Sequence, residues 1–239
     1  MKILSVDVGG THVKVLASDA TEPRKFDSGP TMTPGEMVDR VKTLTQDWSY
    51  EAVSIGYPGV VRHDGIEAQP HNLGDGWVGF DFHEAFGVPV RLINDAAMQA
   101  LGIYEGGRML FLGIGTGLGS AMIVDGAVVP MELAHLPYRK HRTYEEYVGL
   151  AGLQRLGKRK WRKHVWAVVG LLRRALEPDY VVIGGGNAKK LRDLPEGVRL
   201  GENASAFVGG FRLWEKRSAP SDAPMPPAGL DVLRSSRVR

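Results

Sequence analysis

The sequence predicts an α/β protein made of two similar halves that face each other. A β-branched apolar run from Ile3 to Val8 leads into a glycine turn and a second strand at Val13–Val15. The same succession returns at 109–124, where a strand, the turn Gly115–Gly119 and another strand follow one another. An internal repeat of this kind predicts two related units.

Composition limits the classes of protein that fit this chain. Of its 239 residues, 43% are apolar and 24% are charged, as in ordinary globular proteins. It has no cysteine, which excludes disulfides, thiolate nucleophiles and cysteine-ligated zinc. No apolar run reaches the ~20 residues of a membrane span, and the start lacks a signal-peptide pattern, so we expect a cytoplasmic protein with no membrane partner. The net charge of +3 favours anionic partners.

In the first half, short apolar runs alternate with helical patterns. A helix is expected to start at Thr33, because a cap, Pro34 and Glu36 follow the capping-box pattern. Turn residues at 63–80 predict a long loop, and long loops inside compact domains are often functional. The other expected elements are strands at 23–28, 52–56 and 88–93 and a helix at 96–104.

The second half continues the alternation. Asp125-Gly126 is a hairpin signal between strands at 120–124 and 127–129. A long amphipathic helix is expected at 158–176, a strand at 180–183 and a last helix at 206–214. From Lys216 to Arg239, Ser, Ala and Pro dominate without apolar periodicity, which predicts a disordered tail.

Three glycine turns follow strands, at Gly9, Gly115 and Gly184. Glycine leaves backbone N–H groups uncovered, and successive N–H groups form a concave anion site. Asp7 beside the first turn makes sense if a cation, directly or through water, lies between it and a phosphate. A tight turn with a capping aspartate is the alternative for this stretch alone. Together the three turns indicate a nucleotide or polyanion between two domains.

Polar side chains at two further places are candidates for chemistry. Asn94-Asp95 ends a predicted strand, where a carboxylate beside an amide suits general-base activation of an alcohol. The alternative is a capping pair for the next helix, and the two roles are compatible. Glu132 and His135, with Glu145 nearby, fit a metal half-site, a clamp for sugar hydroxyls or an exposed turn.

The segment Lys158–Lys163 carries five cations at the expected start of the long helix. A solvated helix face would explain them. A helix N-terminus is already positive, however, so cations there cost stability unless an anion is near. This favours a polyanion as the partner. Nucleic acid is the alternative partner, but the sequence contains no DNA-reading module.

In these motifs the chain, from about Met1 to Glu215, resembles the ROK sugar kinases, and among them most closely the polyphosphate glucokinases. The resemblance rests on DVGGT at 7–11 with Lys14, GYPG at 56–59, PHNL at 70–73 followed by Gly76-Trp77, NDAA at 94–97, GIGTGLG at 113–119, ELAH at 132–135, Glu145 with Tyr147, and GGG at 184–186.

The resemblance implies an actin-like fold of two ribonuclease H-like α/β domains around an interdomain cleft, at 1–105 and 106–215. It implies transfer of a phosphoryl group from polyphosphate, ATP or both to the 6-hydroxyl of glucose, with Asp95 as general base, Mg²⁺ near Asp7 and a homodimer. The implied sugar ligands are Asn94, Glu132, His135, Glu145, Asn72 and Gly59. The implied donor site comprises Asp7, Gly9, Gly10, Thr11, Lys14, Gly115, Thr116, Gly117, Gly184, Gly185 and Gly186.

The chain departs from the family pattern after His135. Many members hold zinc there with a histidine and several cysteines, whereas this chain has no cysteine, so we expect no zinc site and a His135 that is free for sugar. Ala134 replaces a usual glycine. A kinase of mannose or fructose is one competing interpretation. A non-catalytic sugar- or nucleic-acid-binding regulator is another, and it would need no base at Asp95.

Overall fold

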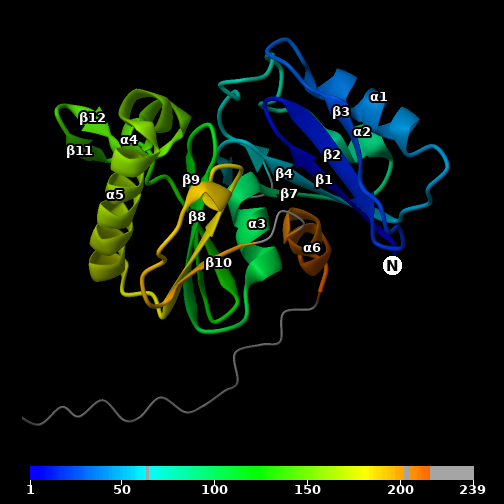
Figure 1. The fold of residues 1–239 in the computed structure, drawn as a ribbon. Helices are drawn as coiled ribbons and strands as arrows, with labels where there is room; N and C mark the ends of the chain where they lie inside the picture. The colour runs from blue at the N-terminus through cyan, green and yellow to red at the C-terminus, as the bar shows by residue number, and fades with distance from the viewer. Residues whose placement is uncertain (63–64, 202–204, 216–239) are drawn as a thin grey trace, which may run out of the picture.

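The computed structural model describes residues 1–62, 65–201 and 205–215 as two five-stranded sheets with helices around and between them (Figure 1). The predicted tail at 216–239 lies outside the described residues. Among the helices in these ranges, none is long and apolar enough to cross a membrane.

The first sheet has the strand order β3-β2-β1-β4-β7. Strands β1, β2 and β3 pair antiparallel, whereas β4 and β7 run parallel to β1. All six residues of β4 are buried, as a strand covered on both faces requires. The strands are β1 (Ile3–Val8), β2 (His12–Ala17), β3 (Arg24–Asp27), β4 (Ala52–Tyr57) and β7 (Val90–Asn94).

Helices α1 (Pro34–Leu44) and α2 (Phe82–Phe86) belong to the first half. The Thr33 side chain accepts a hydrogen bond from the Glu36 N–H at 3.3 Å, as the start signal predicts, while Glu36 itself pairs with Arg40. The predicted loop at 63–80 begins after β5 (Val61–Arg62), which forms a small hairpin with β6 (Gly65–Ile66), and residues 63–64 lie outside the described part.

The second sheet repeats the first, with the order β10-β9-β8-β13-β14. On one side of β8 lie β9 and β10, which are joined by antiparallel pairing. On the other side lie β13 and β14, which are joined by parallel pairing. The predicted internal repeat is therefore confirmed in topology. The strands are β8 (Arg108–Ile114), β9 (Leu118–Val124), β10 (Ala127–Met131), β13 (Tyr180–Gly184) and β14 (Val198–Leu200).

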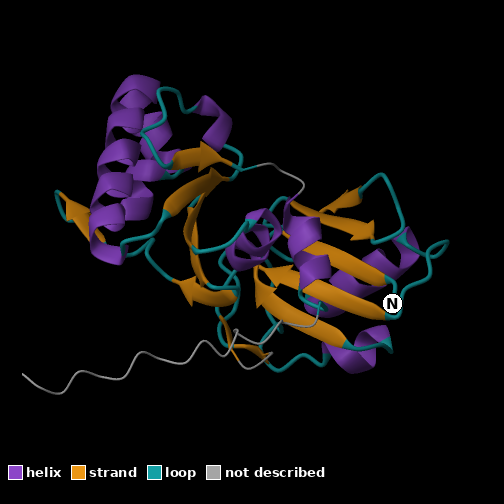
Figure 2. Ribbon diagram, turned by 90° about the horizontal axis from the view of Figure 1, so that it is seen from below, coloured by secondary structure: helices purple, strands orange, loops and turns teal. Residues whose placement is uncertain are grey.

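Two helices, α3 (Asp95–Ile103) and α6 (Ser205–Arg212), lie between the sheets (Figures 1 and 2). They cross closely: a Cβ atom added to Gly209 would lie 1.8 Å from the Met98 carbonyl oxygen. Helix α3 packs on the second sheet and α6 on β1 and β4 of the first. The start of α3 is thereby fixed relative to both sheets.

The remaining elements lie beside the second sheet. Helix α4 (Tyr144–Val148) has the capping box of Thr143 and Glu146, and α5 (Leu150–Leu176) is longer than the predicted 158–176. Gly157 interrupts α5 with φ 71°, so a new helical segment begins at Lys158, the predicted start. The hairpin β11 (Pro137–Arg139) and β12 (Arg142–Thr143) and the 3₁₀ helix η1 (Ala188–Lys190) complete the fold.

Candidate active site

Asp95 is the first residue of α3, directly after β7. The preceding Asn94 caps this helix, because its Oδ1 accepts the Ala97 N–H at 3.1 Å, while its Nδ2 donates to the Gly59 carbonyl at 3.1 Å. The capping interpretation of Asn94 is thus correct. The Asp95 carboxylate is half-buried, and its Oδ1 accepts the Ala96 N–H at 2.7 Å.

Asp7 lies at the same edge of the first sheet. It is paired in register with Gly56 of β4, and Gly56 is paired with Ile93 of β7. Asp7 and Asp95 therefore stand on either side of β4, near the carboxyl ends of three parallel strands. Ligands of open α/β sheets bind beyond this edge.

Both carboxyl groups are held in an environment that disfavours their charge. Burial, the negative charge of Asp7 and, more weakly, that of Glu132 raise the pKa of Asp95 to about 7, although the Ala96 N–H acts in the opposite direction. Burial also raises the pKa of Asp7 against the opposing effect of Lys14, whose Nζ lies 3.6 Å from its Oδ2. A carboxylate that titrates near neutral pH suits a general base.

The first glycine turn joins β1 to β2. The N–H groups of Gly10 and Thr11 donate no hydrogen bond to any other described residue. Neither Gly9 nor Gly10 has a positive φ. Glycine is needed here for close approach instead, since a Cβ atom on Gly10 would lie 2.8 Å from the Asn72 Cβ. Asn72, a predicted sugar ligand, thus lies against this turn.

The second glycine turn, between β8 and β9, likewise presents backbone N–H groups and approaches its neighbours closely. In the described chain the Thr116 and Gly117 N–H groups donate to no acceptor. Gly119 packs against Ala96, next to Asp95: a Cβ atom at Gly119 would lie 2.8 Å from the Ala96 Cβ. The second sheet therefore brings its turn to the start of α3. The first turn follows Asp7, whose charge acts on the same Asp95 carboxylate.

The third turn, Gly184–Gly186, lies beside the second because β13 pairs with β8. Asn187 follows it; its backbone N–H donates to the Ile114 carbonyl at 3.0 Å and its Nδ2 to the Gly115 carbonyl at 2.8 Å. This asparagine is 6% exposed and ties the two turns together. Sequence reasoning missed it, although an asparagine directly after three glycines was a usable signal.

The structure brings only some of the predicted sugar ligands close to Asp95. Glu132 is exposed and close enough to Asp95 to raise its pKa. The Oε2 of Glu145 accepts the Leu118 N–H at 3.1 Å, so this side chain buttresses the second glycine turn. His135 is exposed, and no hydrogen bond or ion pair joins it to another predicted site residue in the described ranges. The roles of all these residues toward a sugar stay predictions.

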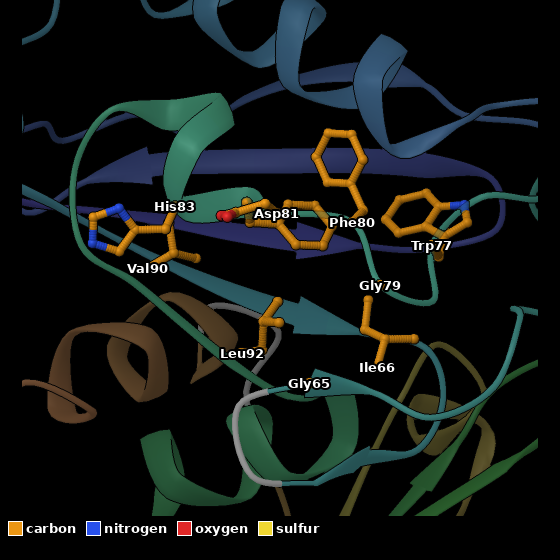
Figure 3. Close-up of a pocket in the computed structure, with 10 residues that line it drawn as sticks. Gly65, Ile66, Trp77, Gly79, Phe80, Asp81, His83, Val90 and Leu92 are labelled. Atoms are coloured by element: carbon orange, nitrogen blue, oxygen red, sulfur yellow. The ribbon is translucent and has the colours of Figure 1, made fainter.

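A hollow of about 450 Å³ lies elsewhere in the first half (Figure 3). Its lining is aromatic and aliphatic, with Asp81 and His83 at one end. It contains none of the predicted site residues. The candidate site is instead an open edge between the two sheets.

The residues near Asp7 fit a weakly ligated Mg²⁺ ion. No group of three or more His, Cys, Asp or Glu side chains among the described residues could hold a metal alone. Mg²⁺ is, however, commonly bound through one or two carboxylates, several waters and substrate phosphates. Asp7, 15% exposed beside free N–H groups, supplies such a carboxylate.

The pKa of Asp95 predicts a pH profile for the reaction. If Asp95 must be ionised to accept a proton, kcat/KM should rise with pH through a midpoint near 7. Glu132→Gln removes a nearby negative charge and should move the midpoint to lower pH, whatever it does to the KM for sugar. Steady-state rates from pH 5.5 to 9 test both statements. A profile that is flat across this range would exclude Asp95 as the base.

Comparison with known proteins shows the family of this chain. Residues 3–130 match the ROK family. The polyphosphate glucokinase of Mycobacterium leprae is 26% identical over 208 residues, which cover 77% of this chain and 63% of that protein. This chain thus spans less than two thirds of that relative.

Solved structures share the fold. The inorganic polyphosphate/ATP-glucomannokinase of Arthrobacter sp. strain KM has a TM-score of 0.74 at 24% identity, covering 87% of this chain and 96% of its own. The ROK family glucokinase of Streptomyces griseus, in complex with glucose and AMPPNP, has a TM-score of 0.72 at 16% identity, covering 89% and 99%. The predicted actin-like, ribonuclease H-like fold is confirmed. With its two related halves and its match over more than half its length, this chain belongs to the ROK family.

Proposed function

We propose that this protein is a glucokinase that transfers a phosphoryl group from polyphosphate, ATP or both to the 6-hydroxyl of glucose. The observation that carries the proposal is the position of Asp95, a carboxylate with a pKa of about 7 near two turns with free N–H groups. The M. leprae relative, a polyphosphate glucokinase, supports the choice of donor and sugar.

In the proposed reaction, Asp95 accepts the proton of the sugar 6-hydroxyl as that oxygen attacks the terminal phosphorus of the donor. The new O–P bond forms as the bond to the leaving phosphate breaks, which releases ADP or a polyphosphate shortened by one unit. Free N–H groups of Gly10, Thr11, Thr116 and Gly117 would stabilise the charge that spreads over the phosphoryl oxygens. Mg²⁺ near Asp7 would supply further neutralisation of that charge.

The sugar would lie beside Asp95, next to the terminal phosphate of the donor. Asn94 retains one amide hydrogen and one lone pair beyond its cap bonds, and Glu132 is exposed beside Asp95. We propose that both bind sugar hydroxyls, together with His135, Glu145, Asn72 and the backbone of Gly59. Enclosure of the sugar would exclude water and suppress wasteful hydrolysis of the donor.

A panel assay tests the proposal. The purified protein is given glucose, mannose, fructose or N-acetylmannosamine, each with ATP and with polyphosphate, in the presence of Mg²⁺, and sugar phosphate is measured. We expect glucose to have the highest kcat/KM and polyphosphate to serve as donor. Turnover of another hexose in preference to glucose would reassign the sugar, and absence of sugar phosphate in every combination would refute the kinase.

A further inference from the structure

Eight cations lie in two segments of the second half, one of which directly follows the third glycine turn. Within the described ranges, no carboxylate forms an ion pair with any of them. They come from two segments that are adjacent in the fold. They are Lys158, Arg159, Lys160, Arg162 and Lys163 of α5, and Lys189, Lys190 and Arg192 at η1.

Hydrogen bonds connect these cations to the phosphate turns. The Lys190 Nζ donates to Asn187 Oδ1 at 2.6 Å, and the Nδ2 of the same buried Asn187 donates to the Gly115 carbonyl. Arg162 Nε donates to the Lys190 carbonyl at 2.7 Å. A continuous contact path therefore runs from the second glycine turn through Asn187 and Lys190 to α5.

The approach to this path is open. Among the described residues, a Cβ atom on Gly115 or Gly186 would meet no atom within 4 Å, so there is open space beside both glycines. The Gly185 and Gly186 N–H groups donate to nothing in the described chain. Lys190 is half-buried, and among the described residues its Nζ has only the neutral Asn187 amide as a partner, so an anion close to it would be stabilising.

Helix α5 extends the positive surface away from the turn. Lys158 and Arg162 are four residues apart and so share one helix face, just after the break at Gly157. Because of that break, these cations occupy the first turns of a new helical segment, although α5 as a whole begins at Leu150. A single terminal phosphate needs few such partners, and a nucleobase needs none. The repeated phosphates of an extended polyphosphate would pair with all of these cations.

We propose that Lys190, Arg162 and Lys158 form a track for the distal phosphates of a linear polyphosphate whose terminal unit lies on the glycine turns, with Asn187 as the residue that positions Lys190. This inference rests on the proposed function and adds a chain-length preference to it. Longer polyphosphates should bind more tightly than triphosphate because they reach more of the track. Their affinity should fall steeply with salt.

The test compares Lys190→Gln and Lys158→Gln with Arg174→Gln. Glutamine at 190 can still donate to Asn187. Lys158 is exposed, and no hydrogen bond or ion pair joins it to another described residue. Arg174 is an exposed cation on the same helix, about 18 Å beyond Arg162 along the axis, and forms no ion pair with a described residue, so it is a matched control. The readouts are KM for triphosphate and for long polyphosphate, KM for glucose, and equilibrium binding of long polyphosphate without sugar at two salt concentrations.

We expect Lys190→Gln to raise KM and Kd for long polyphosphate about tenfold, with a smaller effect on triphosphate and none on the KM for glucose. Lys158→Gln should affect only long chains, and Arg174→Gln nothing. Equal effects on all chain lengths, or variants that match wild type, would overturn the track. Glucose phosphorylation with ATP but no polyphosphate binding would overturn it and leave the kinase standing. Lysine-dependent polyphosphate binding without transfer would refute only the kinase.

Discussion

Replacement of Asp95 by asparagine should lower kcat by roughly 10²–10⁴-fold while the KM for glucose changes little. Asparagine has the shape of aspartate and its amide oxygen can still accept the Ala96 N–H, so the start of α3 should stay in place. What it lacks is a basic oxygen for the proton of the sugar hydroxyl. Steady-state kinetics with saturating donor measure the loss.

A stability measurement separates lost chemistry from misfolding. The pKa of Asp95 is about 7 in the folded protein and about 3.9 in an unfolded chain. The native state therefore binds this proton more tightly, and the resulting stabilisation is complete below pH 4 and is lost as pH rises through 7. Asp95→Asn removes the cost of charging a half-buried carboxylate. The full difference in pKa corresponds to about 4 kcal/mol, and solvent screening of a half-buried group lowers this to about 2 kcal/mol. The variant should therefore be more stable than wild type by about 2 kcal/mol at pH 8 and no more stable at pH 4. A near-normal kcat would remove Asp95 from the mechanism.

Gly209→Ala should destabilise the protein by about 3 kcal/mol, and with it the site. The added methyl group would lie 1.8 Å from the Met98 carbonyl oxygen, so α6 and α3 must separate. Because α3 begins at Asp95, a variant that remains folded should also show a reduced kcat. Thermal unfolding should show a Tm lower by roughly 6–12 °C.

Gly170→Ala is the matched control, since Gly170 is also a glycine in a helix interior. Its added Cβ would make only ordinary contact, 3.5 Å from the Arg174 side chain. Alanine favours helix more than glycine does, so this variant should be slightly stabilised, by at most about 1 kcal/mol. Equal Tm values for both variants would show that α3 and α6 do not cross as closely as described.

The sequence predicts most of the fold because helix caps, turns and strand patterns depend on residues that are close together in the chain. Thr33 and Asn94 cap helices, and Asp125-Gly126 forms a turn, at the positions that the sequence predicts. Asp125 and Gly126 both have positive φ, as a tight hairpin turn requires. The repeated strand–turn–strand pattern correctly indicated two sheets of one topology. The domain boundary at 105 stays a prediction.

What the sequence could not predict depends on contacts between distant segments. The first two glycine turns need glycine for close approach rather than for positive φ, and only the packed structure shows that Asn72 and Ala96 are the neighbours. The path from Gly115 through Asn187 to Lys190 and Arg162 joins residues up to 75 positions from the first glycine. The short elements α2, α4, β11, β12 and β14 carry too few residues for a periodicity.

The most direct test of the account is an experimental structure of the protein with glucose and a non-hydrolysable phosphate donor. The account predicts that the sugar O6 lies within hydrogen-bond distance of the Asp95 carboxylate, and that phosphate oxygens accept N–H groups from both glycine turns. Glucose bound away from Asp95, or phosphates that contact neither Thr11 nor Thr116, would contradict it.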